Sequence, residues 1–415
     1  MLLSIPDMTK IKTHPEEEPD FLISGIKKNV FVLGLVSLFT DIASEMIYPV
    51  IPFFLILVLG VPMSVVGLIE GLAESAASIL KVVSGWFSDK KGVRKPFLVL
   101  GYSISAFSKP VLALALGWPH VLIARLMDRT GKGLRTSARD ALIADSCDPV
   151  NRGRSFGLHR SMDTIGAVVG PMIALVLLYM TSLNYRLVFQ VAILPGLISI
   201  LLVAFFVEER KCTRTDKILF NISQFGKDYK IFLLITILFA LGNSSNVFLI
   251  MRAQDMGFSP YLVILSYILF NIVCSLFSFP LGTLSDKKGR RDIMTAGFLV
   301  FAAVYFGFAL IQKSIYVWPL FVIYGLYEAL TEGIGKAYVV DLVPSDKRAT
   351  ALGIYHAATG IMMLFASIIA GLLWDILGAH VPFIFGGGMA VLSALLLVVL
   401  MPRSYHMIEK IAMDP

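Results

Sequence analysis

The sequence predicts an all-α membrane protein of twelve membrane-spanning helices, arranged as two halves of six. Hydrophobic residues make up 57% of the 415 residues and charged residues only 16%, a balance that is unusual for a soluble domain of this length. Apolar stretches of about 20 residues recur along the whole chain, which is the length that a helix needs to cross a bilayer. A short polar motif occurs once in each half, so we expect an internal repeat.

Twelve apolar segments are expected to span the membrane. The first six lie at 29–57, 64–88, 96–117, 120–143, 154–180 and 186–208. The second six lie at 229–252, 260–284, 292–312, 316–340, 349–374 and 380–402. The polar stretches around them divide the chain into an N-terminal tail (1–28), a first half (29–208), a linker (209–228), a second half (229–402) and a C-terminal tail (403–415).

The distribution of basic residues predicts the orientation. Most of the 36 Lys and Arg residues fall in every second loop, in the linker and in the tails, whereas the opposite loops hold Arg186, Arg252 and Lys313. Basic loops stay in the cytoplasm, so both tails are expected there, in a bacterial inner membrane. This pattern, and not a nucleic-acid-binding stripe, explains the net charge of +7. The three cysteines show no metal-like spacing, so we expect no metal site and no cofactor.

The repeated polar motif has the pattern G-x-x-x-D-x-x-G followed by basic residues. Its two copies contain Gly85, Asp89, Gly92 and Arg94, and Gly282, Asp286, Gly289 and Arg290. The first glycine of each copy allows two helices to approach closely, and the second permits a turn with positive φ. The aspartate stands at a helix end, where it can pair with an arginine or accept hydrogen bonds from a helix N-terminus.

Two copies of this motif, each between two apolar segments, resemble the signature loops of the major facilitator superfamily, which lie between helices 2 and 3 and between helices 8 and 9. The resemblance covers essentially the whole chain from about residue 29 to 402. It implies the superfamily's fold, two six-helix halves related by a pseudo-twofold axis, with substrate bound between the halves near the midplane. It also implies that the motif residues form a conformational latch that closes the cytoplasmic side. The alternative is that they only anchor the topology.

The first span contains ionisable residues at membrane depth. Asp41, Glu45 and Tyr48 are spaced i, i+4, i+7 and therefore share one helix face. Charged groups at this depth are costly and usually functional. Because burial disfavours the charge on a carboxylate while a nearby arginine favours it, Asp41 and Glu45 are candidate proton carriers. A structural ion pair is the alternative.

The fourth span carries a cationic stripe that includes Arg125, Arg129 and Lys132 on one helix face. The stripe must face the protein interior or water, because lipid cannot solvate these charges. Guanidinium groups match the geometry of carboxylates and phosphates, so the stripe favours an anionic substrate. The alternative is that these cations pair with acidic residues of the first and fourth spans, and the two roles can coexist.

The resemblance places spans 1, 4, 7 and 10 around a central cavity. The candidate substrate-binding residues are Tyr48, Arg125, Arg129, Lys132, Asn243, Asn246, Glu328 and Glu332. The candidate proton-coupling residues are Asp41, Glu45, Glu74 of the second span, and His159 and Asp163 of the fifth.

We expect a proton-coupled secondary transporter that works by alternating access and is not an enzyme. Acidic pairs beside a cationic stripe favour a small polar, anionic solute, such as an organic acid or a metal–polycarboxylate (siderophore) chelate. The expected partners are this solute, protons and the lipid bilayer, with the protein acting as a monomer.

Multidrug or metabolite efflux by proton antiport is the alternative function. The fifth span carries glycines and a proline that resemble part of the fifth-helix motif of proton antiporters: Gly157, Gly166, Gly170 and Pro171. The same glycines are equally consistent with a helix-packing seam. A membrane enzyme or receptor is a remote alternative, since no nucleophile–base pair, metal motif or appended soluble domain supports it.

Overall fold

The computed structural model describes residues 21–23, 26–147, 151–210, 222–344 and 347–401. The expected C-terminal tail and large parts of the N-terminal tail and the linker lie outside these residues. Two short strands, β1 (Phe21–Ile23) and β2 (Ile26–Lys27), pair in antiparallel fashion directly before the first long helix. The remaining regular structure of the described chain is helical.

The helices follow the expected spans. In the first half they are α1 (Lys28–Ile47), α2 (Ile51–Phe53), the π-helix η1 (Phe54–Val58), α3 (Met63–Lys91), α4 (Lys95–Ala113), α5 (Trp118–Asp145), α6 (Arg152–Met180), α7 (Tyr185–Val191) and α8 (Ile193–Phe206). After the short 3-10 helix η3 (Ile222–Gln224), the second half contains α9 (Lys227–Gly242), α10 (Val247–Asp255), α11 (Pro260–Lys288), α12 (Arg290–Leu310), the 3-10 helix η4 (Ser314–Tyr316), α13 (Val317–Asp341), α14 (Arg348–Leu377) and α15 (Val381–Leu400).

Eleven helical stretches of the described chain are long and apolar enough to cross a membrane. Helix α5 is the twelfth long helix, with 28 residues. Its sequence is too rich in charge to meet the same criterion, because it carries the cationic stripe. It can occupy a membrane only with that stripe turned toward the other helices or toward water.

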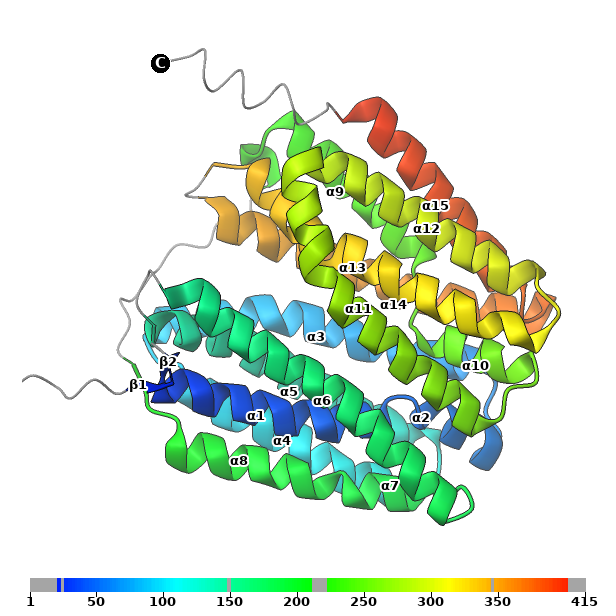
Figure 1. Ribbon diagram of the computed structural model, residues 1–415, viewed down its shortest axis with the longest axis horizontal. Coiled ribbons are helices and arrows are strands. Elements are labelled where there is room, and N and C mark those ends of the chain that lie inside the picture. Colours follow the sequence, from blue (N-terminus) through cyan, green and yellow to red (C-terminus); the bar gives the residue numbers. More distant parts are fainter. Residues whose placement is uncertain (1–20, 24–25, 148–150, 211–221, 345–346, 402–415) are drawn as a thin grey trace, which may run out of the picture.

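Figure 1 shows two bundles, one formed by α1 to α8 and the other by α9 to α15. They meet where α3 packs against α14 and where α6 packs against α11. Helices α3 and α11 are the second spans of their halves, and α6 and α14 are the fifth, so the two contacts are equivalent under a pseudo-twofold axis. The predicted architecture of two six-helix halves is confirmed.

The first and seventh spans are both interrupted. Helix α1 ends at Ile47 and α2 begins at Ile51, while α9 ends at Gly242 and α10 begins at Val247. The two breaks meet between the halves, where the hydroxyl groups of Tyr48 and Ser245 lie 3.4 Å apart. These two residues are separated by the same sequence distance as the two copies of the polar motif. They are therefore equivalent positions of the repeat.

The end of the molecule opposite the two polar motifs is closed by apolar side chains from both halves. Phe53 and Phe54, which follow the break in the first span, belong to one buried core with Phe248 and Ile250 of α10. All four side chains are fully buried. This core excludes water from the space between the halves on that side.

A carboxylate of the second half also caps a helix of the first half at this closed end. Asp375 of α14 accepts hydrogen bonds from the backbone N–H groups of Met63 and Ser64, at 3.0 and 2.8 Å. Met63 begins α3, and the first N–H groups of a helix have no partner within the helix. The cap therefore links the two halves through a helix N-terminus.

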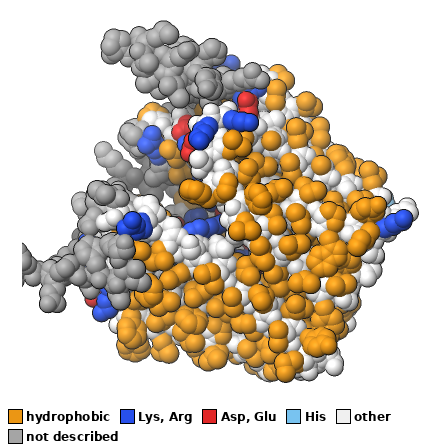
Figure 2. All heavy atoms as spheres, viewed as in Figure 1, with side chains coloured by type: hydrophobic (Ala, Val, Ile, Leu, Met, Phe, Trp, Pro, Cys, Tyr) orange, Lys and Arg blue, Asp and Glu red, His pale blue; other side chains and the backbone are white. Residues whose placement is uncertain are grey.

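The opposite end, which carries the two motifs and is called here the basic-loop end, is open. Figure 2 shows a hollow between the two bundles with Lys and Arg side chains inside it, whereas hydrophobic side chains cover most of the outer surface in this view. Among the exposed side chains are Leu116, at 81%, and Phe279, at 83%. Such a surface fits contact with lipid and not with water.

The second glycine of each motif adopts the predicted backbone. The φ angle is 69° at Gly92 and 95° at Gly289, a region that residues with a side chain rarely occupy. The first glycines differ. A Cβ atom at Gly85 would stand 3.1 Å from that of Ser137, but at Gly282 the described chain places no atom within 4 Å. The expected close helix approach is therefore wrong for the second copy, because a pocket between α11 and α13 opens beside Gly282.

Each motif also contains an arginine that bridges two carboxylates. Arg94 pairs with Asp89 and lies 3.6 Å from Asp145 at the end of α5. In the second half, Arg290 lies 3.4 and 3.1 Å from its two carboxylate partners, Asp286 and Asp341. The predicted pairing of the motif aspartates with arginine is observed. Each pair joins two residues of the same half, and none connects the two halves of the described chain.

Candidate functional site

A polar cavity lies between the two halves and encloses about 1770 Å³, including its open mouth. Its wall is formed by α1, α3, α5 and α6 of the first half and by α11, α13, α14 and the break between α9 and α10 of the second. The predicted site residues in this wall are Asp41, Glu45, Tyr48, Glu74, Arg129, Lys132, Asp163, Asn243, Asn246, Glu328 and Glu332. Arg125 and His159 are not among the residues that line it.

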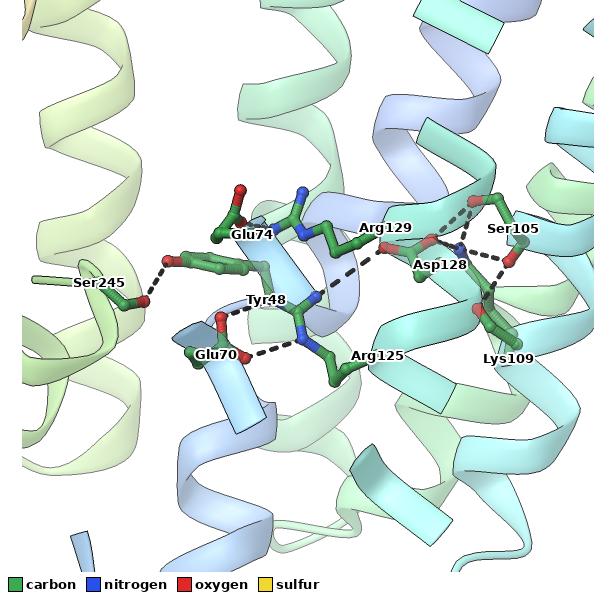
Figure 3. A network of polar contacts seen from close by, with 10 residues as sticks. Tyr48, Glu70, Glu74, Ser105, Lys109, Arg125, Asp128, Arg129 and Ser245 are labelled. Carbon is green, nitrogen blue, oxygen red and sulfur yellow. Dashed lines mark hydrogen bonds and ion pairs between the residues drawn. The ribbon is translucent and has the colours of Figure 1, made fainter. Parts of the chain in front are cut away.

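Arg125 lies behind the wall and is compensated there. Its Nε donates to one carboxylate oxygen of Glu70 at 2.8 Å and its Nη2 to the other at 2.6 Å. Both side chains are at most 2% exposed. Figure 3 shows this two-pronged contact between α5 and α3. The assignment of Arg125 to substrate binding is corrected, because the guanidinium is enclosed by protein and its charge is neutralised.

The same buried network extends to α4. Asp128 lies 3.8 Å from Arg125 and accepts a hydrogen bond from Lys109 at 2.6 Å and another from Ser105 at 2.6 Å. Lys109 is 1% exposed. No role was predicted for Lys109, although a lysine inside the third span is itself a sign of a buried partner. These contacts hold three helices of the first half together (Figure 3).

Arg129 lines the cavity but is also paired. Its Nη2 lies 2.9 Å from the carboxylate of Glu74. The ring of Tyr48 lies over two guanidinium groups. The ring centroid is 5.5 Å from Cζ of Arg125 and 5.7 Å from Cζ of Arg129. Cation–π contacts of this kind are attractive and favour a fixed ring. The acidic partners of the stripe thus come mainly from α3, and not from the first span.

Lys132 differs from the two arginines. Its side chain is exposed to the cavity, and no ion pair within 4.0 Å connects it to another residue of the described chain. Its charge acts on the carboxylates of Asp41 and Glu45, which line the same wall. Lys132 is therefore a cation that a solute can reach.

The two carboxylates of the first span have different surroundings. Glu45 accepts a hydrogen bond from the hydroxyl of Tyr267 on α11 at 2.9 Å, which crosses between the halves. For Asp41, the described residues offer no hydrogen bond or ion pair within 4.0 Å. Behind Asp41, Gly166 packs so closely that a Cβ there would lie 2.8 Å from the Cβ of Asp41. This contact favours the packing-seam interpretation of the glycines in the fifth span.

His159 is buried behind the cavity wall, which corrects its assignment as an accessible proton-coupling group. Its Nε2 lies 2.8 Å from the hydroxyl of Ser37, and its Nδ1 lies 3.7 Å from the carboxylate of Asp163. Asp163 itself reaches the cavity. The histidine is therefore linked to the cavity through its neighbours, by Asp163 on one side and on the other by Ser37, whose hydroxyl accepts a hydrogen bond from the cavity-lining Arg139 at 3.0 Å.

The second half contributes a wall of aromatic and amide groups with two glutamates. Tyr324 donates a hydrogen bond to Asn246 at 2.7 Å, and Asn243 donates one to Tyr327 at 3.0 Å. Glu328 has no hydrogen bond or ion pair to its carboxylate among the residues that the structure describes. These amides belong to the seventh span, as predicted, and lie at its break between α9 and α10, which was not predicted.

Glu332 is the glutamate nearer the mouth, and it links the halves. It lies 3.4 Å from Arg160 of α6 and 3.3 Å from Lys336 on its own helix. Two further residues that line the cavity from α11, Tyr267 and Asn271, were not predicted. Their i, i+4 spacing in an otherwise apolar helix was the signal that could have identified them.

A family model described as Major Facilitator Superfamily matches residues 33–227 and 231–413. The chain belongs to the major facilitator superfamily. An uncharacterised MFS-type transporter of Methanocaldococcus jannaschii is 39% identical over 383 residues, which cover 90% of this chain and 95% of that protein. The chain is thus a membrane transporter of this superfamily, as the repeated motif predicted.

Other members of the superfamily are more distant. The multidrug resistance protein MdtH of Photorhabdus laumondii is 32% identical over 128 residues, or 31% of each chain. A solved POT family transporter in complex with 5-aminolevulinic acid has a TM-score of 0.76 at 13% identity and covers 90% of this chain and 96% of its own. A D-xylose–proton symporter has a TM-score of 0.72 at 17% identity, with coverage of 92% and 99%. At these identities the structures show the shared fold alone.

Proposed function

We propose that this superfamily member is a proton-coupled secondary transporter of a small polar, anionic solute. The observation that carries the proposal is Lys132, a cation in the cavity wall with no ion-pair partner within 4.0 Å in the described chain. Arg125 and Arg129 are already neutralised by Glu70 and Glu74. An anionic group that enters the cavity can therefore form a charge-assisted hydrogen bond with Lys132 without breaking an existing pair.

The same region supports proton coupling. Asp41 and Glu45 lie near Lys132 on the cavity wall. A bound anion would therefore favour a proton on one of these carboxylates, and that proton would in turn favour binding of the anion. Glu45 is also tied to Tyr267 of the other half. Loading a proton there would alter a contact that crosses between the halves, which is the kind of link that coupled transport requires.

Alternating access is supported by the difference between the two ends. The apolar core and the Asp375 cap close one end, while the cavity opens at the basic-loop end. By the distribution of Lys and Arg, we place the basic-loop end in the cytoplasm. The motif residues would then act as the latch when the cavity closes on that side and opens on the other.

The test is uptake by the purified protein in liposomes with an imposed pH gradient. A panel of organic acids and metal–polycarboxylate chelates should contain a solute that accumulates when the gradient is present and does not when it is collapsed. Lys132→Gln should weaken uptake of that solute, Lys132→Arg should retain more of it, and Lys313→Gln, an exposed lysine at the closed end, should not change it. Uptake that Lys132→Gln leaves unaltered would contradict the anion site.

A second candidate is efflux of drugs or metabolites by proton antiport. It is favoured by the partial identity to the multidrug resistance protein MdtH. In the same liposomes, an antiporter would release protons in exchange for cationic or neutral drugs, and Lys132→Gln would not weaken their transport. The two functions therefore differ in which compounds are transported and in whether Lys132→Gln weakens their transport.

A further inference from the structure

Lys132 and Glu328 occupy equivalent positions in the two halves. Helix α5 ends at Asp145 and α13 ends at Asp341, and the two residues precede these ends by the same number of positions. Both side chains line the central cavity. The pseudo-twofold axis therefore places a cation and a carboxylate at the same distance from the basic-loop end. From the rise per residue of an α-helix, this distance is roughly 20 Å along each helix.

Neither of these two side chains is compensated by a close partner. In the part of the chain that the structure describes, no ion pair within 4.0 Å reaches Lys132 or Glu328. Their neighbours one turn away are both paired, Arg129 with Glu74 at 2.9 Å and Glu332 with Arg160 at 3.4 Å. At this depth α5 therefore offers a ligand one positive charge and α13 one negative charge, while Asp41 and Glu45 of α1 line the wall near Lys132.

The surroundings of Glu328 suit an organic ammonium group. Tyr324 precedes it by one turn on α13 and lines the cavity together with Phe270 of α11. The centroid of the Tyr324 ring lies 5.4 Å from that of Phe270 and 5.1 Å from that of Tyr327. The Tyr324 and Phe270 side chains are 1% and 5% exposed, so they bound the space beside Glu328, and the carboxylate supplies the charge that attracts a cation. The hydrogen bond from Tyr324 to Asn246 holds the ring in place.

The whole cavity wall is balanced in charge. Its basic side chains are Lys81, Arg129, Lys132, Arg135, Arg139, Arg160 and Lys336, and its acidic side chains are Asp41, Glu45, Glu74, Asp140, Asp163, Glu328 and Glu332. A ligand with a single negative charge would satisfy the Lys132 side and leave Glu328 without a counter-charge in a space partly withdrawn from water. A ligand with both charges satisfies the two sides together.

We propose that the substrate is a small zwitterion of the amino-acid type, whose anionic group binds Lys132 and whose ammonium group binds Glu328 beside Tyr324. This inference rests on the proposed function, because it keeps the anion site at Lys132 and adds a cation site in the other half. The two ends of such a ligand contact different halves. A bound zwitterion therefore connects the halves, whereas an analogue with one charge contacts only one of them.

The experiment compares three forms of each ligand on purified full-length protein in detergent. The probes are the twenty proteinogenic amino acids, their N-acetyl derivatives, which lack the positive charge, and their methyl esters, which lack the negative charge. Binding is measured as thermal stabilisation and then by titration. We expect at least one amino acid to bind roughly tenfold to a hundredfold more tightly than both of its derivatives, the range for losing one charge-assisted contact.

Two variants then test which residue binds which charged group of the ligand. Lys132→Gln should remove the preference of the amino acid over its methyl ester and keep the preference over its N-acetyl form. Glu328→Gln should do the reverse. Lys313→Gln, outside the cavity, should keep both preferences. A general loss of folding would weaken the binding of all three forms of the ligand together. Opposite changes of preference in the two variants would therefore show that the residues bind the ligand and do not merely stabilise the fold.

The outcomes distinguish the inference from the proposed function beneath it. If N-acetyl amino acids or simple dicarboxylic acids bind as tightly as the zwitterions and depend on Lys132, the zwitterion inference is overturned and the anion site stands. If zwitterions bind and Lys132→Gln does not change their affinity, both are overturned. If no amino acid of the panel stabilises the protein, the inference is overturned as well.

Discussion

Replacing Arg125 by methionine should destabilise the protein strongly, because it leaves the Glu70 carboxylate charged and buried. The two side chains share two hydrogen bonds of 2.8 and 2.6 Å and are at most 2% exposed. Removing one partner of a buried ion pair typically destabilises a protein by about 3–5 kcal/mol. Asp128 loses only a 3.8 Å contact and keeps Lys109 at 2.6 Å, so we expect a value within this range and not above it.

The assay is a double-mutant cycle on the purified protein in detergent, with unfolding followed by heat or denaturant. The variants are Arg125→Met, Glu70→Gln and the double variant. Because the double variant contains no unpaired charge at this site, it should recover much of the stability that each single variant loses. Lys132→Met is the matched control, since it removes from the same helix an exposed cation that forms no ion pair within 4.0 Å among the described residues. It should change stability by less than about 0.5 kcal/mol.

Two results would refute this account of the buried pair. One is an Arg125→Met variant as stable as Lys132→Met, which would mean that water or another cation reaches Glu70. The other is a double variant whose loss equals the sum of the two single losses, which would mean that the two side chains do not depend on each other. Ligand affinity adds a check: Arg125 lies behind the cavity wall, so folded Arg125→Met protein should bind its substrate with nearly unchanged affinity.

Three further predictions concern transport and conformation. Asp41→Asn should abolish accumulation driven by a pH gradient in liposomes while sparing some exchange, and gradient-driven accumulation at the wild-type level would exclude a role in coupling. Asp89→Asn should shift the protein toward the state that is open at the basic-loop end, measured by the reactivity of cysteines introduced into the cavity; unchanged reactivity and transport would leave the motif as a topology anchor only. Asp375→Ala should remove the cap of α3 and favour opening of the closed end by about 1 kcal/mol, the usual value of a helix N-cap, or about fivefold in population. Spin labels on α3 and α14 would report that shift, and an unchanged distance distribution would show that the cap does not hold the end closed.

The fold was predictable because its signals are local and repeated. Apolar segments of the right length recur, the charge of the loops alternates, and the motif appears once in each half. Even backbone detail followed, since the positive φ of Gly92 and Gly289 was expected from the turn that each motif requires. The two strands before α1 were not expected, as five residues of mixed character give no periodic pattern.

The site was predictable only as far as helix faces determine it. The spacing along α5 placed Arg125 and Lys132 on one stripe, but only tertiary packing decides that the first is enclosed against α3 and the second faces the cavity. The hydrogen-bond partner of Glu45 could not be predicted either, because Tyr267 reaches Glu45 from the other half. The open space at Gly282 depends on how far α11 stands from α13, and a local motif contains no information on that separation.

The contact between Tyr48 and Ser245 has a mechanical consequence. When two equivalent positions of a repeat touch each other, their contact lies on the axis that relates them, and a rotation of the two halves about a line through this contact displaces it least. If the halves rotate as the proposed alternating access requires, the interrupted first and seventh spans would act as a fulcrum, with the closed apolar core on one arm and the two basic loops on the other. A slight rotation at the fulcrum, small enough to preserve the 3.4 Å approach of the two hydroxyl groups, is magnified in proportion to the length of each arm.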